Sequence, residues 1–176
     1  EQGWQVIDVD KTGHRALQEE QAALEAAFGT AIFHPDGQVN RQALGEIVFS
    51  DSGKLRTLEA IVHPRMREIV RQSAAFYTGR GVNVCINAAL LFPMDLHSLC
   101  RYVVVVKAPL LLRVKRARRR NGWSYPQILK RFWSQRRLFP KKKTKNVDMY
   151  NVGNSESREV LQQKIAEFLT MIERQG

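Results

Sequence analysis

Apolar residues along the chain fall into short continuous runs and into longer stretches with helical spacing. The runs at residues 4–9, 82–87 and 101–106 are typical of β-strands, and residues 147–152 form a weaker candidate. The run at 82–87 follows Gly81, and we expect a strand buried on both faces of a parallel sheet. Parallel strands need crossover connections, so helices are expected between them.

Apolar residues three or four positions apart predict these helices. The first spans residues 13–28 and ends at Gly29. Further helix starts are marked by capping or proline residues at Asn40, at residues 51–53, at Pro109 and at Asn154 or Ser155. The positions expected to face the core are Leu17, Leu24, Phe28, Leu44, Ile47, Val48, Leu55, Leu58, Val62, Ile69, Val70, Leu161, Ile165, Phe168, Leu169 and Ile172.

The dipeptide His63-Pro64 interrupts one of these helical patterns. Proline lacks an amide N–H and restricts the residue before it, so we expect a helix break that leaves the His63 ring available to a ligand. The alternative is a histidine with a structural role only. The three helices expected over residues 40–77 have no strand between them, which indicates a helical insertion at 33–80. The whole pattern predicts a single α/β domain, residues 1–176, with a parallel sheet in a three-layer fold.

The composition fits one globular domain. The chain has 176 residues, 44% of them hydrophobic, which is enough to bury a substantial core. Cys85 and Cys100 are too few for a disulfide framework or a metal site, so we expect buried thiols and a cytoplasmic location. The sequence has neither an apolar run of about 18 residues nor a signal-peptide pattern, so it favours neither a membrane span nor secretion.

The positive charge is concentrated in residues 113–145. This segment holds 14 of the 28 Lys and Arg residues and no Asp or Glu. The rest of the chain has 14 basic and 17 acidic residues, a net charge of −3. The segment therefore either faces solvent as a charged surface or binds an anionic partner.

The arginines of this segment are arranged at helical spacing. Arg116, Arg120 and Arg131 are interleaved with apolar residues, and Ser124 followed by Gln127 matches a capping box that opens a second helix. We expect two arginine-bearing helices joined by a short Asn-Gly turn. Such a pair can fold over a polyphosphate, and it can also bind a nucleic acid backbone.

Two carboxylates follow the first predicted strand. Asp8 and Asp10 lie at its C-terminal end, which in parallel sheets is the edge that binds ligands. A polar strand end or a helix cap is the alternative.

Several short segments occur in an order and spacing that span nearly the whole chain. They are VIDVDK (6–11), DGQVNRQAL (36–44), LEAIVHP (58–64), ALLF (89–92), Arg116 and Arg120 followed by Arg131 and Gln135, and Asn154. Together they resemble the dephospho-CoA kinase family. The resemblance implies a P-loop kinase fold of the nucleotide kinase type. It implies an enzyme that uses ATP with Mg²⁺ to phosphorylate the ribose 3′-hydroxyl of dephospho-CoA, giving CoA in the last step of its biosynthesis.

The resemblance also implies roles for individual residues. Asp10 matches the catalytic carboxylate, and Asp8 is expected to hold Mg²⁺ through water. Arg116 matches the catalytic arginine that approaches the phosphates, and Arg120 matches the second arginine of a lid, residues 113–145, that closes over ATP. The substrate side is matched by Arg41, His63 and Leu91, and the ATP side by Arg131, Gln135 and Asn154, with Asn154 near the adenine.

One motif of that family does not occur. No GxxxxGK pattern, whose backbone and lysine cradle phosphates, is present in the 176 residues. Because Glu1 reads as the end of a helix, we expect a preceding strand, loop and helix to be absent from this sequence. A polypeptide that began at Glu1 is expected to have little or no kinase activity and to expose strand edges. Smaller departures from the family pattern are Ala89, Pro93 and Cys100.

A second hypothesis is a catalytically silent relative whose basic segment binds RNA or another polyanion. RNA-binding surfaces usually display aromatic residues, and the segment contains Trp123, Tyr125, Phe132 and Trp133. At their spacing we expect these rings to pack the lid against the body instead. The kinase is therefore the favoured hypothesis, with ATP and dephospho-CoA as partners and nucleic acid as the less expected one.

Overall fold

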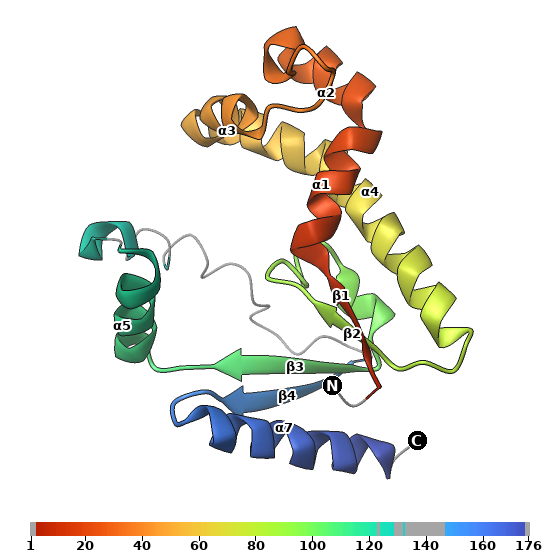
Figure 1. Cartoon of the computed structure of the whole chain (residues 1–176), viewed down its shortest axis with the longest axis vertical. Helices are drawn as coiled ribbons and strands as arrows, with labels where there is room; N and C mark the ends of the chain where they lie inside the picture. Colours follow the sequence, from red (N-terminus) through yellow and green to blue (C-terminus); the bar gives the residue numbers. More distant parts are fainter. Residues whose placement is uncertain (1–2, 123, 129–131, 133–146, 175–176) are drawn as a thin grey trace. The chain divides into compact units, whose positions relative to one another are not determined.

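The computed structural model describes residues 3–122, 124–128, 132 and 147–174. The chain divides into two units, Glu1–Leu96 and His97–Gly176, each with its own pair of parallel strands (Figure 1). The predictions for Trp123, Arg131, Trp133 and Gln135 lie outside the described residues. Parallel strands that alternate with helices confirm the predicted α/β class.

The first unit contains strands β1 (Gln5–Asp8) and β2 (Val84–Asn87). They pair in parallel with Ile7 opposite Ile86, so both strands end at the same edge. The prediction that the second strand is buried on both faces is wrong, because exposed and half-buried residues alternate along it. Ile7 and Ile86 face the covered side, whereas Val6 and Cys85 face the exposed side. Cys85 is therefore not the buried thiol that was expected, and Cys100 is half-buried.

Helix α1 (Val9–Glu19) follows β1 directly, and α2 (Gln21–Phe28) follows α1. The expected single helix over residues 13–28 thus starts earlier and is divided in two. It starts early because the Asp8 side chain accepts the backbone N–H of Asp10 and caps the helix. It is divided because Glu20 leaves the helical conformation, with φ −104° and ψ 22°.

Helices α3 (Arg41–Ser50) and α4 (Ser52–Thr78) follow a short 3₁₀ turn, η1 (Thr30–Ile32). The predicted break at His63-Pro64 is wrong, because α4 runs through Pro64 without interruption, and the three expected helices are two. An internal proline costs a helix about 3 kcal/mol through its lost hydrogen bond. Burial of Val62 on one side of the proline and of Ile69 and Val70 on the other side offsets that cost.

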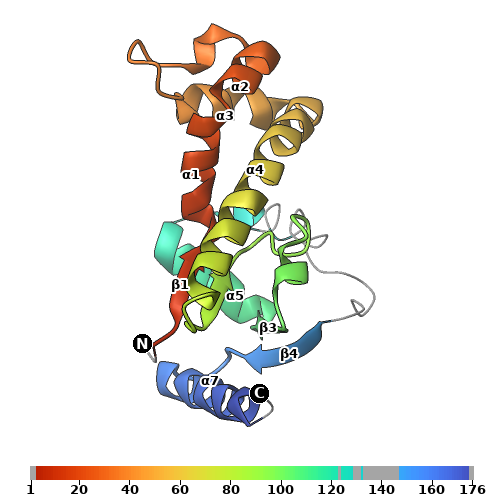
Figure 2. The ribbon, with the colours of Figure 1, turned by 90° about the vertical axis from the view of Figure 1, so that its right-hand side faces the viewer.

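The core of the first unit lies among its helices. Helices α1 and α4 pack against each other, and both views show them side by side (Figures 1 and 2). The buried cluster consists of Ala16, Leu24, Ile32, Val39, Leu44, Val48, Val62 and Ile69. Helix α4 also packs against β1 and β2, so it joins the helical core to the sheet.

The second unit contains β3 (Tyr102–Lys107), α5 (Leu110–Asn121), β4 (Asp148–Gly153) and α7 (Arg158–Glu173), and η2 (Leu96–Leu99) spans the point in the sequence where the first unit ends and the second begins. Strands β3 and β4 pair in parallel, with Lys107 opposite Gly153 at their carboxyl ends. Helix α5 is capped by Pro109, which thus precedes the first turn, and it ends at Gly122 with φ 66°, a left-handed conformation that glycine adopts readily.

Two details of the last helix differ from the sequence pattern. The N-cap of α7 is Ser157, whose hydroxyl accepts from the N–H of Val160, and neither Asn154 nor Ser155 caps the helix. The inner face is as predicted, with Ile172 buried and Leu161, Ile165, Phe168 and Leu169 half-buried. Phe168 packs edge-on against Tyr150 with ring centroids 5.1 Å apart, which fixes the helix on β4.

Candidate functional site

The carboxyl edge of β1 and β2 carries three polar side chains. Asp8 ends β1 opposite Asn87, which ends β2. Asp10 lies in the first turn of α1 and is exposed. One oxygen of Asp8 accepts the N–H of Asp10 at 3.2 Å, so this carboxylate is oriented by the helix that it caps. Asp10 is therefore presented to solvent at the edge where parallel sheets bind ligands.

A polar stripe runs along α1 from this edge. Asp10, His14 and Gln18 are four residues apart and share one face of the helix. His14 and Gln18 were not predicted as site residues, although their spacing from Asp10 was a usable signal. The stripe leads from the sheet edge to a pocket among the helices.

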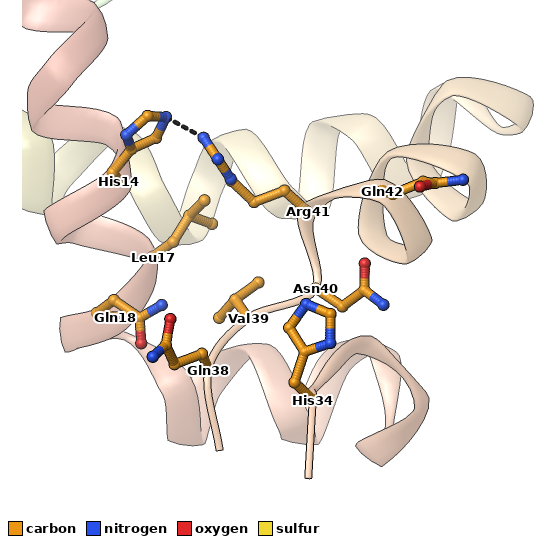
Figure 3. A pocket seen from close by; sticks show the side chains of 9 residues that line it. All are labelled: His14, Leu17, Gln18, His34, Gln38, Val39, Asn40, Arg41 and Gln42. Atoms are coloured by element: carbon orange, nitrogen blue, oxygen red, sulfur yellow. Dashed lines mark hydrogen bonds between the residues drawn. The ribbon is translucent and has the colours of Figure 1, made fainter. Parts of the chain in front are cut away.

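The pocket has a volume of about 470 Å³ (Figure 3). Its lining comes from α1, from residues 34–40 and from the start of α3, namely His14, Leu17, Gln18, His34, Gln38, Val39, Asn40, Arg41 and Gln42. Arg41 Nη1 contacts Nε2 of His14 across the pocket. None of the described residues that line the pocket is acidic. The pocket is therefore polar, and its fixed charge is positive.

The loop on one side of the pocket is held by backbone bonds. His34 N–H donates to the Gln38 carbonyl at 2.8 Å, and Asn40 N–H donates to the Ile32 carbonyl at 2.7 Å. The Asn40 side chain accepts the N–H of Ala43 at 3.1 Å and caps α3, as predicted. Arg41 is therefore presented from the first turn of a capped helix.

His63 and Leu91 are not among the residues that line this pocket. His63 lies half-buried in the middle of α4. Leu91 lies in a turn after β2 and is half-buried, with its carbonyl accepting from Leu96 N–H at 2.9 Å. The structure therefore groups Arg41 with His14 and leaves the other two predicted substrate residues elsewhere in the first unit.

Arg116 and Asn154 meet in the second unit. Arg116 Nη1 donates to the Asn154 carbonyl at 2.9 Å and to Asn154 Oδ1 at 3.1 Å. The Asn154 N–H donates to the Lys107 carbonyl at 2.7 Å, which holds it at the carboxyl end of β3. Arg120 lies one turn beyond Arg116 in α5. The two residues expected on the phosphate and adenine sides of a nucleotide thus lie in contact.

Comparison with known proteins identifies the family. A family model described as dephospho-CoA kinase matches residues 1–157. The chain belongs to the dephospho-CoA kinase family. A dephospho-CoA kinase of Dehalococcoides mccartyi is 35% identical over 138 residues, covering 77% of this chain and 70% of that protein. A dephospho-CoA kinase of Lactobacillus johnsonii is 31% identical over 173 residues, which cover 96% of this chain and 86% of that protein.

Solved structures give the same fold. TT1252 from Thermus thermophilus superposes with a TM-score of 0.73 at 29% identity, covering 96% of this chain and 85% of that one. Dephospho-CoA kinase from Campylobacter jejuni superposes with a TM-score of 0.71 at 24% identity, covering 98% of this chain and 86% of that one. This likeness concerns the fold alone. Among the helices of the described residues, none qualifies as a membrane-spanning segment.

We expect His63 to make the stability of this family member depend on pH. Burial lowers the pKa of His63 below its usual 6.5, and the charge of Glu59 partly opposes that shift. Just below 6.5 the unfolded chain then binds more protons than the folded one, so the free energy of unfolding falls as the pH is lowered. We expect the free energy of unfolding of His63→Gln to fall less than that of wild type as the pH is lowered, because the variant lacks the titrating imidazole.

Urea unfolding at about pH 5 and about pH 8 measures the effect, because groups other than His63 contribute equally to both proteins and cancel in the difference. An identical decline in wild type and variant would contradict the assignment.

Proposed function

We propose that this chain transfers the γ-phosphoryl group of ATP to the ribose 3′-hydroxyl of dephospho-CoA, giving CoA. The observation that carries the proposal is the family match over residues 1–157. The exposed carboxylate of Asp10 at the strand edge supports it, since the reaction needs a base at an open ligand-binding edge. Formation of CoA would make this the last step of CoA biosynthesis.

In this proposal Asp10 orients the 3′-hydroxyl and accepts its proton as the oxygen attacks the γ-phosphorus. Phosphoryl transfer leaves little covalent chemistry to the protein, so positioning of the hydroxyl is the main contribution of this residue. The helix that follows β1 starts at Val9, which places Asp10 in its first turn. The position is therefore fixed by backbone geometry and does not depend on a flexible loop.

Asp8 supplies a second carboxylate for the Mg²⁺ that accompanies ATP. Mg²⁺ is usually held by one or two carboxylates together with substrate phosphates and water, and the Asp8–Asp10 pair fits this donor set. Bound Mg²⁺ would neutralise charge on the β- and γ-phosphates. The Asp8 oxygen that accepts from Asp10 N–H keeps the carboxylate turned toward the helix start.

The second unit supplies the ATP side. Arg116 and Arg120 stabilise negative charge on the moving phosphoryl group, and Asn154 contacts the adenine. Guanidinium groups suit this task because they stay charged and present paired donors. Arg131 and Gln135 complete the lid in this proposal, and Arg41, His63 and Leu91 serve the dephospho-CoA side.

The test is product formation by the protein expressed from its complete coding sequence. Incubation with ATP, Mg²⁺ and dephospho-CoA is expected to give CoA, identified by mass and by phosphate at the 3′ position. Phosphate release without CoA would overturn the proposal. In that case a salt-sensitive gel shift with RNA would support the alternative of a silent, polyanion-binding relative.

The described ring contacts weigh against that alternative. Arg113 lies over Phe132 at 4.3 Å and Arg118 lies over Tyr125 at 4.7 Å. Rings stacked on the protein's own arginines are occupied by cation–π contacts, whereas an RNA-binding surface presents its rings to bases.

A further inference from the structure

The pocket of the first unit has two chemically different parts. His14 and Arg41 lie at one end of the view in Figure 3, and Gln18 and Gln38 lie at the other end. The first part carries a guanidinium, which binds phosphate oxygens through paired donors. The second part carries carboxamides, which bind neutral amides as donor and acceptor.

The His14–Arg41 contact defines the charge of the first part. Arginine has donors only, so His14 Nε2 accepts from Arg41 Nη1 in this contact. The guanidinium of Arg41 is therefore the fixed positive group of the first part. Since none of the described lining residues is a carboxylate, the field of Arg41 is not cancelled inside the pocket.

The second part is pre-organised by Gln21. Its Nε2 donates to Oε1 of Gln18 at 2.7 Å and to the Gly37 carbonyl at 2.9 Å, which ties α1 to the loop beside Gln38. The side chains of Leu17 and Val39 lie between the polar groups. An amide-containing chain with aliphatic groups fits this combination.

The spacing between Asp10 and His14 along α1 indicates which group of a bound ligand lies beside each residue. Asp10 and His14 are one helical turn apart, which corresponds to about 6 Å along α1. In dephospho-CoA the 3′-hydroxyl and the pyrophosphate are separated only by C3′, C4′ and C5′ and their bonds to oxygen. A ribose hydroxyl at Asp10 therefore brings the pyrophosphate to the level of His14 and Arg41.

We propose that His14 and Arg41 bind the pyrophosphate of dephospho-CoA and that Gln18 and Gln38 bind the amides of its pantetheine arm. The stripe Asp10, His14 and Gln18 then aligns the substrate along α1, with the reacting hydroxyl at the sheet edge. This inference rests on the proposed function, because it uses the assignment of Asp10 to the 3′-hydroxyl. It adds His14, Gln18 and Gln38 as substrate-binding residues.

Two adenine-free probes test the division of the pocket, 4′-phosphopantetheine and pantetheine. Their affinities for the protein expressed from its complete coding sequence are measured by ligand-observed NMR titration. Wild type is expected to bind 4′-phosphopantetheine about 10- to 100-fold more tightly than pantetheine, the range for a charge-assisted contact. Arg41→Ala is expected to bring this ratio close to one while leaving the affinity for pantetheine unchanged.

Gln38→Ala is expected to weaken both probes by about 3- to 10-fold and to keep their ratio, as loss of a neutral hydrogen bond does. Arg15→Ala is the matched control for charge. Arg15 neighbours His14 on α1 but pairs with Glu19 at 2.6 Å, and its loss should leave both affinities unchanged. An unchanged ratio in Arg41→Ala, or an effect of Arg15→Ala equal to that of Arg41→Ala, would overturn the proposal.

The outcome separates this inference from the proposed function. Formation of CoA with an unchanged KM for dephospho-CoA in Arg41→Ala would remove the subsite and keep the kinase. A collapsed probe ratio in a protein that forms no CoA would keep the subsite and remove the kinase.

Discussion

Asp10→Asn is expected to lower the rate of phosphoryl transfer to dephospho-CoA by about 10²- to 10⁴-fold, the usual contribution of a general base. The asparagine keeps the size of the side chain but does not accept the proton of the 3′-hydroxyl. Because Asp10 is exposed in the first turn of α1, the substitution removes no buried contact. The fold should lose only the small helix-dipole stabilisation of an acidic residue near a helix start, about 0.3–1 kcal/mol.

The measurement is kcat and KM for dephospho-CoA in wild type, Asp10→Asn and a control, Glu25→Gln. Glu25 is an exposed residue of α2 that lies outside the pocket lining, so the control removes one negative charge from the same unit. We expect kcat to fall in Asp10→Asn with little change in KM, and neither to change in Glu25→Gln. A kcat for Asp10→Asn within about threefold of wild type would show that Asp10 is not the base.

The strands and the position of Asp10 were predictable because the signals for them are local. A short apolar run with two aspartates at its end already places carboxylates at the end of a strand, and β1 (Gln5–Asp8) lies within the predicted run 4–9, one residue shorter at each end. The Asn-Gly turn is likewise encoded by one residue, since Gly122 adopts a left-handed conformation at the end of α5. Ser124 N–H donates to Gln127 Oε1 at 2.9 Å, so half of the predicted capping box is formed.

The errors arise where packing overrides a local preference. Pro64 does disfavour a helix, but apolar residues are buried both before it, at Val62, and after it, at Ile69 and Val70, and this keeps α4 continuous. The division at Glu20 involves neither glycine nor proline, and the sequence contains no signal for it.

The pocket was missed for a related reason. Spacing along α1 aligns His14 with Asp10, but only the tertiary structure brings Arg41 to His14, 27 residues further along the chain. Val39 and Leu44 lie in the same buried cluster as Ala16, and their packing sets that approach. A pattern of one helix shows which residues share a face, whereas the partner on the other side depends on the whole core.

Arg116→Ala is expected to lower kcat for CoA formation by about 10²- to 10³-fold, as the loss of one group that stabilises transition-state charge does. Arg116→Lys should recover little of this, because lysine keeps the charge but lacks the planar, paired donors. In the structure one nitrogen of Arg116 holds both the carbonyl and the side chain of Asn154, an arrangement that a lysine ammonium does not reproduce with the same geometry.

Steady-state kinetics of wild type, both variants and Arg119→Ala tests this. Arg119 is an exposed cation of the same helix, so its loss controls for the general positive field of α5. Arg119→Ala should stay within about threefold of wild type. ATP hydrolysis without dephospho-CoA provides a second readout. If Arg116 acts only once a lid has closed over ATP, the variant and wild type must differ in hydrolysis as well as in transfer, and equal hydrolysis by the two would count against closure.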